Sequence, residues 1–520
     1  MNPDLVLVPT AVLYVVASLL LFFFGSNLIV FSVRVWRRGV SKGHEPQPIP
    51  DAELPHVTVQ LPVYNELYVS KRIIDAVANF DYPADRLQIQ VLDDSTDETS
   101  LIVASAVAEA AARGLNIVHR RRDDRIGYKA GALAEGTAEA TGEFIAIFDA
   151  DFVPQPNFLR RSIPHFDSDD IAFVQARWGH VNRDYSWLTR LQALAIDGHF
   201  LVEQAGRGLA GYWFNFNGTA GVWRASAIED AGGWKADTLT EDLDLSYRAH
   251  LKGWRAKFLE DLVVPAEVPA QLTGFRRQQH RWARGSLECA YRLLPQVWRS
   301  SAGPMTKVQA TLHLCAYFIQ LLLLLLLLIY PLVVSVSIEY PQFSTIFGIG
   351  YLFALTSLAP TIFFVTGSRQ GGRNWVRDLP QILAVTAFGA GLMVNTARAA
   401  LQIFTRKNPS FERTAKFGLE ESDESEQSWT LKRYQLAPDR IIFAEIALGL
   451  YAAFAAYLAF DNSNWGVFTY ATIFGLGLFA VAGATLSHSI VLHRARRQRE
   501  TAVRTETERL TLSGPTPMAS

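Results

Sequence analysis

The chain has 520 residues, of which 49% are hydrophobic and 19% are charged. Its 49 basic and 50 acidic side chains leave a formal net charge of -1, which argues against a nucleic-acid partner. The two cysteines, Cys289 and Cys315, are too few for a disulfide framework or a zinc site. Redox chemistry is therefore not expected.

Charged residues are segregated along the chain. Residues 5–33 contain none and are long enough to cross a hydrocarbon core of about 30 Å, so residues 1–44 are expected to form a retained membrane anchor. Residues 45–300 have a globular composition and are expected to form a soluble domain. Residues 301–495 are expected to form a membrane bundle, and residues 496–520 a polar, disordered tail.

Five further apolar runs follow the soluble domain. Residues 379–403 are expected to form an interfacial or re-entrant helix, because the clean apolar run from Leu379 to Val394 is shorter than a usual span. The alternative is a further full span with polar residues facing the bundle. The runs expected to span the bilayer lie at about 308–338, 343–366, 441–460 and 467–492.

Basic residues predict the orientation in the membrane. The first 33 residues contain no Lys or Arg, whereas four such residues follow by Lys42. We therefore expect the N-terminus outside and the soluble domain in the cytoplasm. The basic loop at 406–440 and the basic tail are expected in the cytoplasm as well, which requires that 379–403 does not cross. The prediction is a multi-pass protein of the plasma or inner membrane.

Strands and helices alternate in the soluble domain. The stretches "HVTVQL", "LQIQVL", "NIVHRR" and "EFIAIF" have strand character, and the Ala-rich residues 101–114 and 129–140 are predicted helices. This order predicts a parallel, doubly wound, Rossmann-like α/β sheet that binds ligands at the carboxyl ends of its strands. The carboxylates near those ends are Glu66, Asp93, Asp94, Asp149 and Asp151.

The motif "DAD" follows the apolar strand Phe144 to Phe148. Alternate residues of a strand project to one side, so Asp149 and Asp151 are expected to point the same way. Mg²⁺ or Mn²⁺ is usually held by one or two carboxylates together with substrate phosphates. The pair therefore predicts a clamp for a metal diphosphate, and the alternative is a pair of solvated loop carboxylates.

The motif "TED" precedes a predicted helix. Thr240 could be an N-cap with Glu241 and Asp242 in the first turn, which is a structural explanation of the motif. The functional explanation is sugar transfer with inversion, which needs a base to remove the proton of the acceptor hydroxyl. Asp242 is the candidate base.

The motif "QQHRW" lies in a basic stretch just before the membrane runs. On a helix, Gln278, Arg281 and Trp282 have the spacing i, i+3, i+4 and share a face. Arg281 offers a planar fork for phosphate oxygens, and Trp282 offers an apolar plate for a sugar ring. The alternative is that the Trp and the neighbouring arginines anchor the helix at the membrane surface.

In this order, "LDDS", "DAD", "TED" and "QQHRW" followed by membrane helices resemble a family-2 membrane glycosyltransferase of the cellulose synthase superfamily. The stretches "QLPVYNE", "GYKAGAL" and "FNFNGTAGVWR" are most similar to the cellulose-synthase-like A and C groups and their bacterial relatives. The resemblance covers nearly the whole chain. It implies a glycosyltransferase A-type fold and inverting, processive β-glycosyl transfer. Hexosyl units from UDP-glucose or GDP-mannose would be added to a growing glycan that crosses the membrane.

The resemblance also implies roles for individual residues. The metal, Mg²⁺ or Mn²⁺, would be held by Asp149 and Asp151, and the catalytic group would be Asp242 within Thr240, Glu241 and Asp242. The nucleotide sugar would be bound by Glu66, Asp93 or Asp94, Lys129, Gln278 and Arg281. The acceptor would be bound by Trp282, Asn217 and Gly218.

Relatives carry a cytoplasmic gating loop of the form F-x-V-T-x-K, and "FERTAKFG" within residues 409–418 lies where that loop is expected. Phe411, Thr414 and Lys416 match the pattern, whereas Arg413 stands in place of Val. A gating loop must be cytoplasmic, which agrees with a non-crossing segment at 379–403. A regulatory domain for a cyclic dinucleotide is not expected.

Two other functions fit parts of this pattern. Transfer of one sugar to a lipid carrier or glycolipid would use the same motifs, although the gating-like loop favours the polymerase. A catalytically inactive membrane transporter or structural protein is the third hypothesis, and the intact set of acids argues against it. The sequence predicts neither the donor, the linkage, the oligomeric state nor any protein partner.

Overall fold

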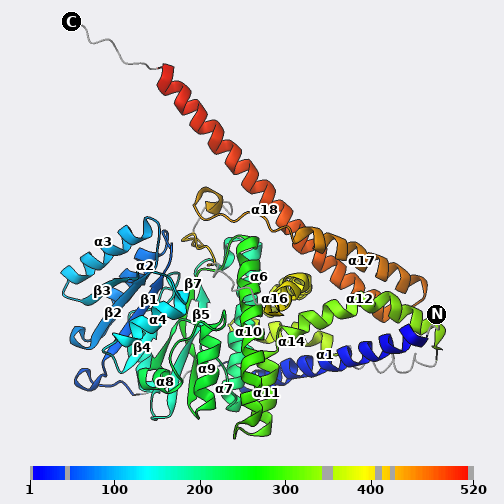
Figure 1. Ribbon diagram of the computed structural model, residues 1–520, viewed down its shortest axis with the longest axis horizontal. Coiled ribbons are helices and arrows are strands. Elements are labelled where there is room, and N and C mark those ends of the chain that lie inside the picture. The colour runs from blue at the N-terminus through cyan, green and yellow to red at the C-terminus, as the bar shows by residue number, and fades with distance from the viewer. Residues whose placement is uncertain (1–3, 41–46, 342–354, 405–412, 422–427, 513–520) are drawn as a thin grey trace.

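An α/β domain lies beside a bundle of long helices, and the last helix extends away from both (Figure 1). The computed structural model describes residues 4–40, 47–341, 355–404, 413–421 and 428–512.

The α/β domain is built on a seven-stranded sheet with the strand order β3-β2-β1-β4-β6-β5-β7. The four predicted strands are confirmed, and they pair in parallel as β3-β2-β1-β4. The strands are β1 Val57–Val63, β2 Leu87–Asp93, β3 Asn116–Arg121, β4 Phe144–Ile147, β5 Ile171–His180, β6 Gly221–Arg224 and β7 Arg255–Ala266.

The expected doubly wound α/β sheet is confirmed, but it is mixed, because β6 breaks the parallel order. Strand β6 runs antiparallel to both β4 and β5, whereas β5 and β7 are parallel. The reason lies in the connection: β5 ends at the carboxyl edge, and the chain then passes through helical turns before β6 begins at that same edge. Those turns are α6 Trp187–Gly198, the π-helix η5 His199–Gln204 and α7 Ala205–Ala210.

This topology brings later parts of the chain to the edge predicted for ligands. Residues 217 and 218 lie just before β6, and Glu267 lies just after β7, so both flank the carboxyl ends of β1 and β4. Helix α9, Glu241–Leu251, begins near the same edge: Thr240 and Glu241 at its start line a cavity there.

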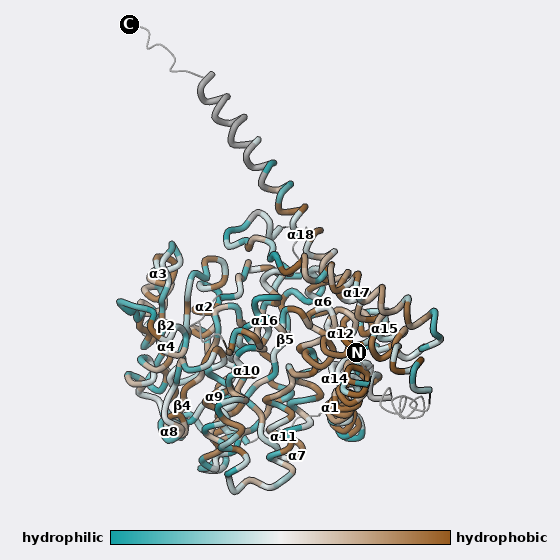
Figure 2. The backbone as a smooth tube through the Cα atoms, turned by 45° about the vertical axis from the view of Figure 1, so that its right-hand side comes forward, coloured by the Kyte–Doolittle hydropathy of each residue, from teal (hydrophilic) through white to brown (hydrophobic). Residues whose placement is uncertain are grey.

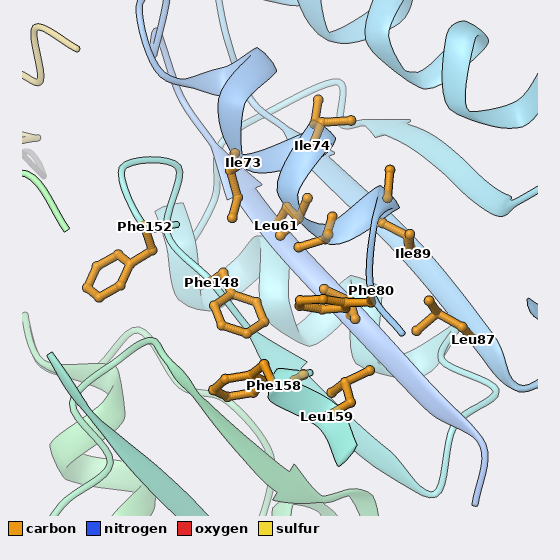
Figure 3. Packing of buried hydrophobic residues seen from close by; sticks show 14 of the residues in the cluster. Leu61, Ile73, Ile74, Phe80, Leu87, Ile89, Phe148, Phe152, Phe158 and Leu159 are labelled. Atoms are coloured by element: carbon orange, nitrogen blue, oxygen red, sulfur yellow. The ribbon is translucent and has the colours of Figure 1, made fainter. Parts of the chain in front are cut away.

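Helices cover the sheet, and its central strands β1 and β4 are buried on both faces. The predicted helices are confirmed as α3 Thr99–Ala112 and α4 Tyr128–Ala138, and α2 spans Ser70–Ala78. Figure 3 shows Ile73 and Ile74 of α2 against Leu61 of β1. Phe148 contacts Phe158 with ring centroids 4.9 Å apart, so the end of β4 is held by aromatic packing beneath the ligand-binding edge.

Apolar residues gather along the helices of the bundle (Figure 2). Within the described ranges, five helices are long and apolar enough to cross a membrane. They are α1 Asp4–Arg38, α12 Phe318–Glu339, the helix pair α15 Trp375–Gly391 and α16 Met393–Phe404, α17 Ile442–Asp461, and the first part of α18 Trp465–Leu512.

Some predicted spans differ from the helices observed. The run at 308–338 is divided, because α11 Pro304–Leu314 ends before α12 begins at Phe318. The run at 343–366 lies partly outside the described residues, and its described part continues into α14 Ala359–Gln370. Segment 379–403 is interrupted at Leu392, yet it is also long enough to cross, so its interfacial placement stays a prediction.

The expected disordered tail is wrong as far as Leu512, because α18 continues to that residue. The sequence contains no Gly or Pro between Gly483 and Gly514, and it is rich in Arg, Glu and Ala. These residues have high helix propensity, so a helix that begins in the bundle can extend through polar sequence.

Helix α10, Leu272–Arg299, connects the two regions. It packs against α9 of the α/β domain on one side and against α16 of the bundle on another. Because "QQHRW" lies in its first half, the motif is placed between the sheet edge and the bundle (Figure 1).

Candidate active site

A cavity of about 180 Å³ lies where the carboxyl ends of β1, β2 and β4 face α9 and α10. Every predicted site residue that the structure describes lines it, except Asp93; Phe411 lies outside the described residues. The predicted residues in its wall are Glu66, Asp94, Lys129, Asp149, Asp151, Asn217, Gly218, Thr240, Glu241, Asp242, Gln278, Arg281, Trp282, Thr414 and Lys416.

The structure separates the two neighbouring acids of "LDDS". Asp93 is buried, and its carboxylate accepts hydrogen bonds from Ser95 N at 2.8 Å and Ser100 Oγ at 2.6 Å. Burial alone would raise the pKa of Asp93, but hydrogen bonds from His119, Ser100 and Ser95 hold it below its usual value. Asp94 instead lines the cavity, so it is the acid of this pair that can meet a ligand.

Asp149 and Asp151 follow β4 and both reach the cavity, as the predicted clamp requires. Lys129 Nζ lies 2.5 Å from Asp149 Oδ1, and Lys416 Nζ lies 2.7 Å from Asp151 Oδ2. Among the described residues, no three His, Cys, Asp or Glu side chains form a metal-binding group. A Mg²⁺ or Mn²⁺ ion held by these two carboxylates would take its other ligands from a diphosphate and water.

The structure bears out part of the structural explanation of "TED", because Glu241 and Asp242 lie in the first turn of α9 and Asp242 Oδ1 accepts a hydrogen bond from Leu243 N at 2.8 Å. Thr240 stands at the N-cap of α9, but its side chain makes no capping hydrogen bond and lies 3.5 Å from Cys289 Sγ. Asp242 is half-buried in the cavity wall, and this burial together with the charge of Glu241 raises its pKa to about 7, against the opposing charge of Lys129. A carboxylate with that pKa is suited to accept a proton near neutral pH.

Gly218 is needed beside this carboxylate for two reasons. Its φ of +77° is a conformation that side chains disfavour, and a Cβ atom would lie 3.0 Å from Asp242 Oδ2. The Gly218 carbonyl oxygen also accepts a hydrogen bond from Lys129 Nζ at 2.8 Å. The glycine thus lets the backbone approach both the candidate base and the lysine.

The predicted face of α10 is confirmed. Gln278, Arg281 and Trp282 all line the cavity, so these side chains lie at the site rather than only at a membrane surface. Arg276, two residues before Gln278, is buried in the opposite direction against Glu445 of α17.

A match to known proteins agrees with this geometry. The family described as "Glycosyltransferase like family 2" matches residues 55–285. The probable glucomannan 4-beta-mannosyltransferase 15 of Arabidopsis thaliana is 36% identical over 381 residues, which cover 68% of this chain and 70% of that protein. The chain belongs to glycosyltransferase family 2.

Other relatives match this family-2 glycosyltransferase over a shorter range. Glucomannan 4-beta-mannosyltransferase 1 of Oryza sativa subsp. japonica is 44% identical over 285 residues, covering 52% of this chain and 55% of the relative. The chain thus spans about half the length of that relative. A solved mannosyltransferase from Pyrobaculum calidifontis, in complex with GDP-Man and Mn²⁺, is 19% identical. The match covers 78% of this chain and 100% of that chain, with a TM-score of 0.46.

In this family-2 glycosyltransferase, the described part of the gating-like segment contributes Arg413, Thr414 and Lys416 to the cavity wall. Arg413 Nη1 lies 3.1 Å from Glu66 Oε2, and Lys416 pairs with Asp151 as described. Burial raises the pKa of Glu66 to about 8, against the charge of Arg413 and with the charge of Asp151. Arg413, which departs from the relatives' pattern, is thus a direct partner of a predicted donor-binding acid.

Glu267 anchors the same segment and was not predicted. It is 2% exposed, and its carboxylate accepts hydrogen bonds from the backbone N–H groups of Phe417, Gly418 and Leu419 at 2.7, 2.8 and 3.2 Å. Burial raises the pKa of Glu267, against the charge of Lys416. The sequence signal was a lone acid in the apolar stretch "VVPAEVPA", because a buried acid needs partners.

The π-helix η5 holds Asn217 and was also not predicted. His199 Nε2 lies 3.1 Å from Asn217 Oδ1, and Asn217 Nδ2 donates to Gln204 Oε1 at 2.9 Å. Turns of π-helix are rare and are frequent at functional sites. The amide of Asn217 is therefore engaged by the protein on both of its polar ends.

Tyr64 and Arg125 form a third feature that sequence patterns missed. The Arg125 guanidinium lies 3.3 Å from the centroid of the Tyr64 ring, and both residues line the cavity beside Asp94. No short motif marks this pair, because its members come from separate loops that meet only in the folded sheet.

Proposed function

We propose that the chain is an inverting hexosyltransferase that extends a β-glycan from a nucleotide sugar and passes the product into its helix bundle. The observation that carries the proposal is the shared cavity: a carboxylate with a raised pKa, a pair of metal-binding acids and the "QQHRW" face of α10 line one site. That site adjoins the bundle through α10 and α16. Repeated transfer at a fixed site beside a bundle is consistent with a processive enzyme.

The donor would occupy the wall formed by the sheet edge. The stacked pair Tyr64 and Arg125 offers a flat surface for the nucleotide base, with Asp94 beside it. Lys129, Gln278 and Arg281 are the candidate contacts of the diphosphate. A Mg²⁺ or Mn²⁺ ion held by Asp149 and Asp151 would offset negative charge on the leaving diphosphate.

The acceptor would stand on Trp282, with its hydroxyl toward Asp242. Asp242 takes the proton from the acceptor hydroxyl, and the freed oxygen forms a bond to the anomeric carbon. The bond from that carbon to the diphosphate oxygen breaks on the opposite face, which inverts the anomeric centre. The nucleoside diphosphate leaves, and the proton remains on Asp242 until it passes to solvent.

The cavity is smaller than most ligand-binding pockets. Ligand pockets usually have volumes of about 300–1,000 Å³, whereas this cavity measures about 180 Å³. Arg413 and Lys416 are among the side chains that narrow it. Donor binding would therefore displace at least Lys416 from Asp151, which is consistent with a gating role for this segment.

The relatives' names make a mannosyl donor the first one to test. The purified protein in detergent is incubated with GDP-mannose or UDP-glucose, with Mn²⁺ or Mg²⁺, and the product is digested with linkage-specific hydrolases. We expect a β-linked product from one of the two donors. Absence of nucleotide release with both donors, in the presence of either metal, would contradict the proposal.

A second candidate function, transfer to a glycolipid, is favoured by a separate observation. A groove of about 1150 Å³ shares Lys129, Leu239 and Glu241 with the wall of the cavity. Its far side is lined by apolar residues of α12 and α16, including Phe318 and Phe404. A groove with one polar end and one apolar end suits an acceptor with a sugar head and an alkyl chain.

The two functions are separated by filling this groove. Ala400→Trp adds bulk to the wall of the groove at a residue that does not line the cavity. If glycolipids are the acceptors, transfer to an alkyl glycoside should fall while transfer to a soluble oligosaccharide is retained. If the enzyme extends a free glycan, both rates should stay close to those of the unmodified protein.

A further inference from the structure

One buried ion pair joins α10 to the bundle. Arg276 Nη2 lies 2.6 Å from Glu445 Oε2 of α17, and the two side chains are 2% and 0% exposed. The same nitrogen donates to the carbonyl oxygen of Val481 in α18 at 3.3 Å. From α16, Asn395 Nδ2 donates to the carbonyl oxygen of Arg276 at 3.1 Å. Arg276 is thus in contact with three different helices of the bundle.

Arg276 lies on the side of α10 that faces away from the cavity. An α-helix turns by about 100° per residue, so Gln278, Arg281 and Trp282 point about 200°, 140° and 240° away from Arg276. Those three side chains line the cavity, whereas Arg276 does not. One helix therefore presents its substrate face on one side and its membrane contact on the other.

The chemistry of this pair is poorly suited to stabilising the fold. Nε and Nη1 of Arg276 and Oε1 of Glu445 are buried and have no hydrogen-bond partner among the described residues. A buried ion pair with unsatisfied polar atoms gives little net stability over a well-packed apolar pair. Ionisable side chains within membrane helices are rare and usually serve a function. Stability alone does not account for the pair.

We propose that Arg276 and Glu445 are positioning residues that fix the rotation and depth of α10 against the bundle. A purely apolar contact would allow small rotations or shifts of the helix at little cost, whereas a displaced charge would lose its partner in a buried setting. The pair thereby holds Gln278, Arg281 and Trp282 in the cavity. This inference rests on the proposed function, because it takes the α10 face to be the substrate-binding face.

The test is the double variant Arg276→Met/Glu445→Met. It removes both charges together and so avoids the unpaired buried charge that either single variant would leave. We expect a folded protein whose kcat for hexosyl transfer falls at least tenfold and whose Kd for GDP or UDP rises several-fold. A double variant with the kcat and Kd of the unmodified protein would overturn the inference.

The matched control is Arg38→Met/Glu260→Met, which removes an ion pair of 2.7 Å between α1 and β7. Neither residue lines the cavity, so loss of this ion pair should leave kcat and the Kd for GDP or UDP unchanged. An equal loss in the control would mean that removing any such pair perturbs the site, and the inference would then be wrong.

A milder variant covers the case in which the double variant does not fold. Glu445→Gln keeps the size of the side chain and one accepting oxygen but leaves the buried charge of Arg276 without its counter-ion, so we expect a folded protein with a lowered melting temperature and a partial loss of kcat. An unchanged kcat would contradict the inference. The Kd for GDP or UDP can be measured even if the protein transfers neither sugar. Failure of the unmodified protein to transfer either sugar would therefore overturn the proposed function but not this inference.

Discussion

The carboxylates on the two walls of the cavity, the sheet edge and α9, differ in their charged partners. On the sheet wall, Asp94, Asp149 and Asp151 each have a cation within 2.7 Å, and Glu66 has Arg413 at 3.1 Å. On the α9 wall, Asp242 lies beside Glu241 and its pKa rises to about 7. Acids that are paired with a lysine or arginine can exchange that cation for a metal ion bound to a diphosphate. An acid without so close a basic partner, here called uncompensated, is suited to accept a proton. The pairs of the sheet wall are Asp94 with Arg122, Asp149 with Lys129, and Asp151 with Lys416.

The largest effect should come from removing the uncompensated acid. Asp242→Asn keeps the shape of the side chain but cannot take the acceptor proton, and general-base catalysis contributes about 10²–10⁴-fold. We expect sugar transfer to fall by about that factor, while the Kd for GDP or UDP changes less than threefold. Nucleotide release and calorimetric titration measure the two quantities. Unchanged transfer would exclude Asp242 as the base.

The dependence of kcat/KM on pH should follow the protonation of Asp242. Because burial and Glu241 raise the pKa of Asp242 to about 7, the carboxylate is mostly protonated below that pH. We expect kcat/KM to fall about tenfold per pH unit below pH 7 and to level off above it. Glu241→Gln removes the neighbouring charge and should move the rise toward lower pH. A profile that is flat from pH 5 to 8 would refute the assignment.

A smaller effect is expected where the gating-like segment is anchored. Glu267→Gln leaves a single accepting oxygen for three backbone N–H groups, and an unsatisfied buried group costs about 1–3 kcal/mol. We expect faster hydrogen exchange at residues 417–419 and a modest loss of transfer. Glu420→Gln is the control, because that side chain is 62% exposed. Equal exchange in both variants would argue against anchoring by Glu267.

The smallest effect tests the compensated wall. Lys416→Met removes the ammonium group that pairs with Asp151, so the carboxylate becomes more available to a divalent ion. We expect Mn²⁺ to bind about threefold more tightly without nucleotide, as measured by electron paramagnetic resonance. Lys71→Met, at an exposed pair with Asp75, should not change Mn²⁺ binding. Weaker binding in Lys416→Met would mean that the lysine does not compete with the ion.

Much of this wall could be predicted from the sequence because local patterns determine it. The strand "EFIAIF" followed by "DAD" places two acids at a carboxyl end, and the spacing of Gln278 and Arg281 places them on one helix face. These inferences need only the period of a strand or a helix. They failed to distinguish Asp93 from Asp94, because that choice depends on where His119 and Ser100 lie after folding.

The remaining parts of the site depend on long-range topology. Asn217 reaches the cavity because β6 enters the sheet from its carboxyl edge, and Glu267 does so because β7 ends there. Neither direction is encoded in a short motif. The π-helix at His199 was likewise hidden, because its residues have ordinary helical preferences and only the contact with Asn217 marks the distortion.

Helix α18 has a mechanical consequence of its own. Its 48 residues rise by about 72 Å, more than twice the thickness of a hydrocarbon core of about 30 Å. At the tilts usual for membrane helices, about 0–40°, a helix of this length that spans the bilayer would extend well beyond it. The fluorescence anisotropy of a dye attached near the end of α18 would therefore report the orientational motion of the whole helix. Such a dye would lie far from the active-site cavity.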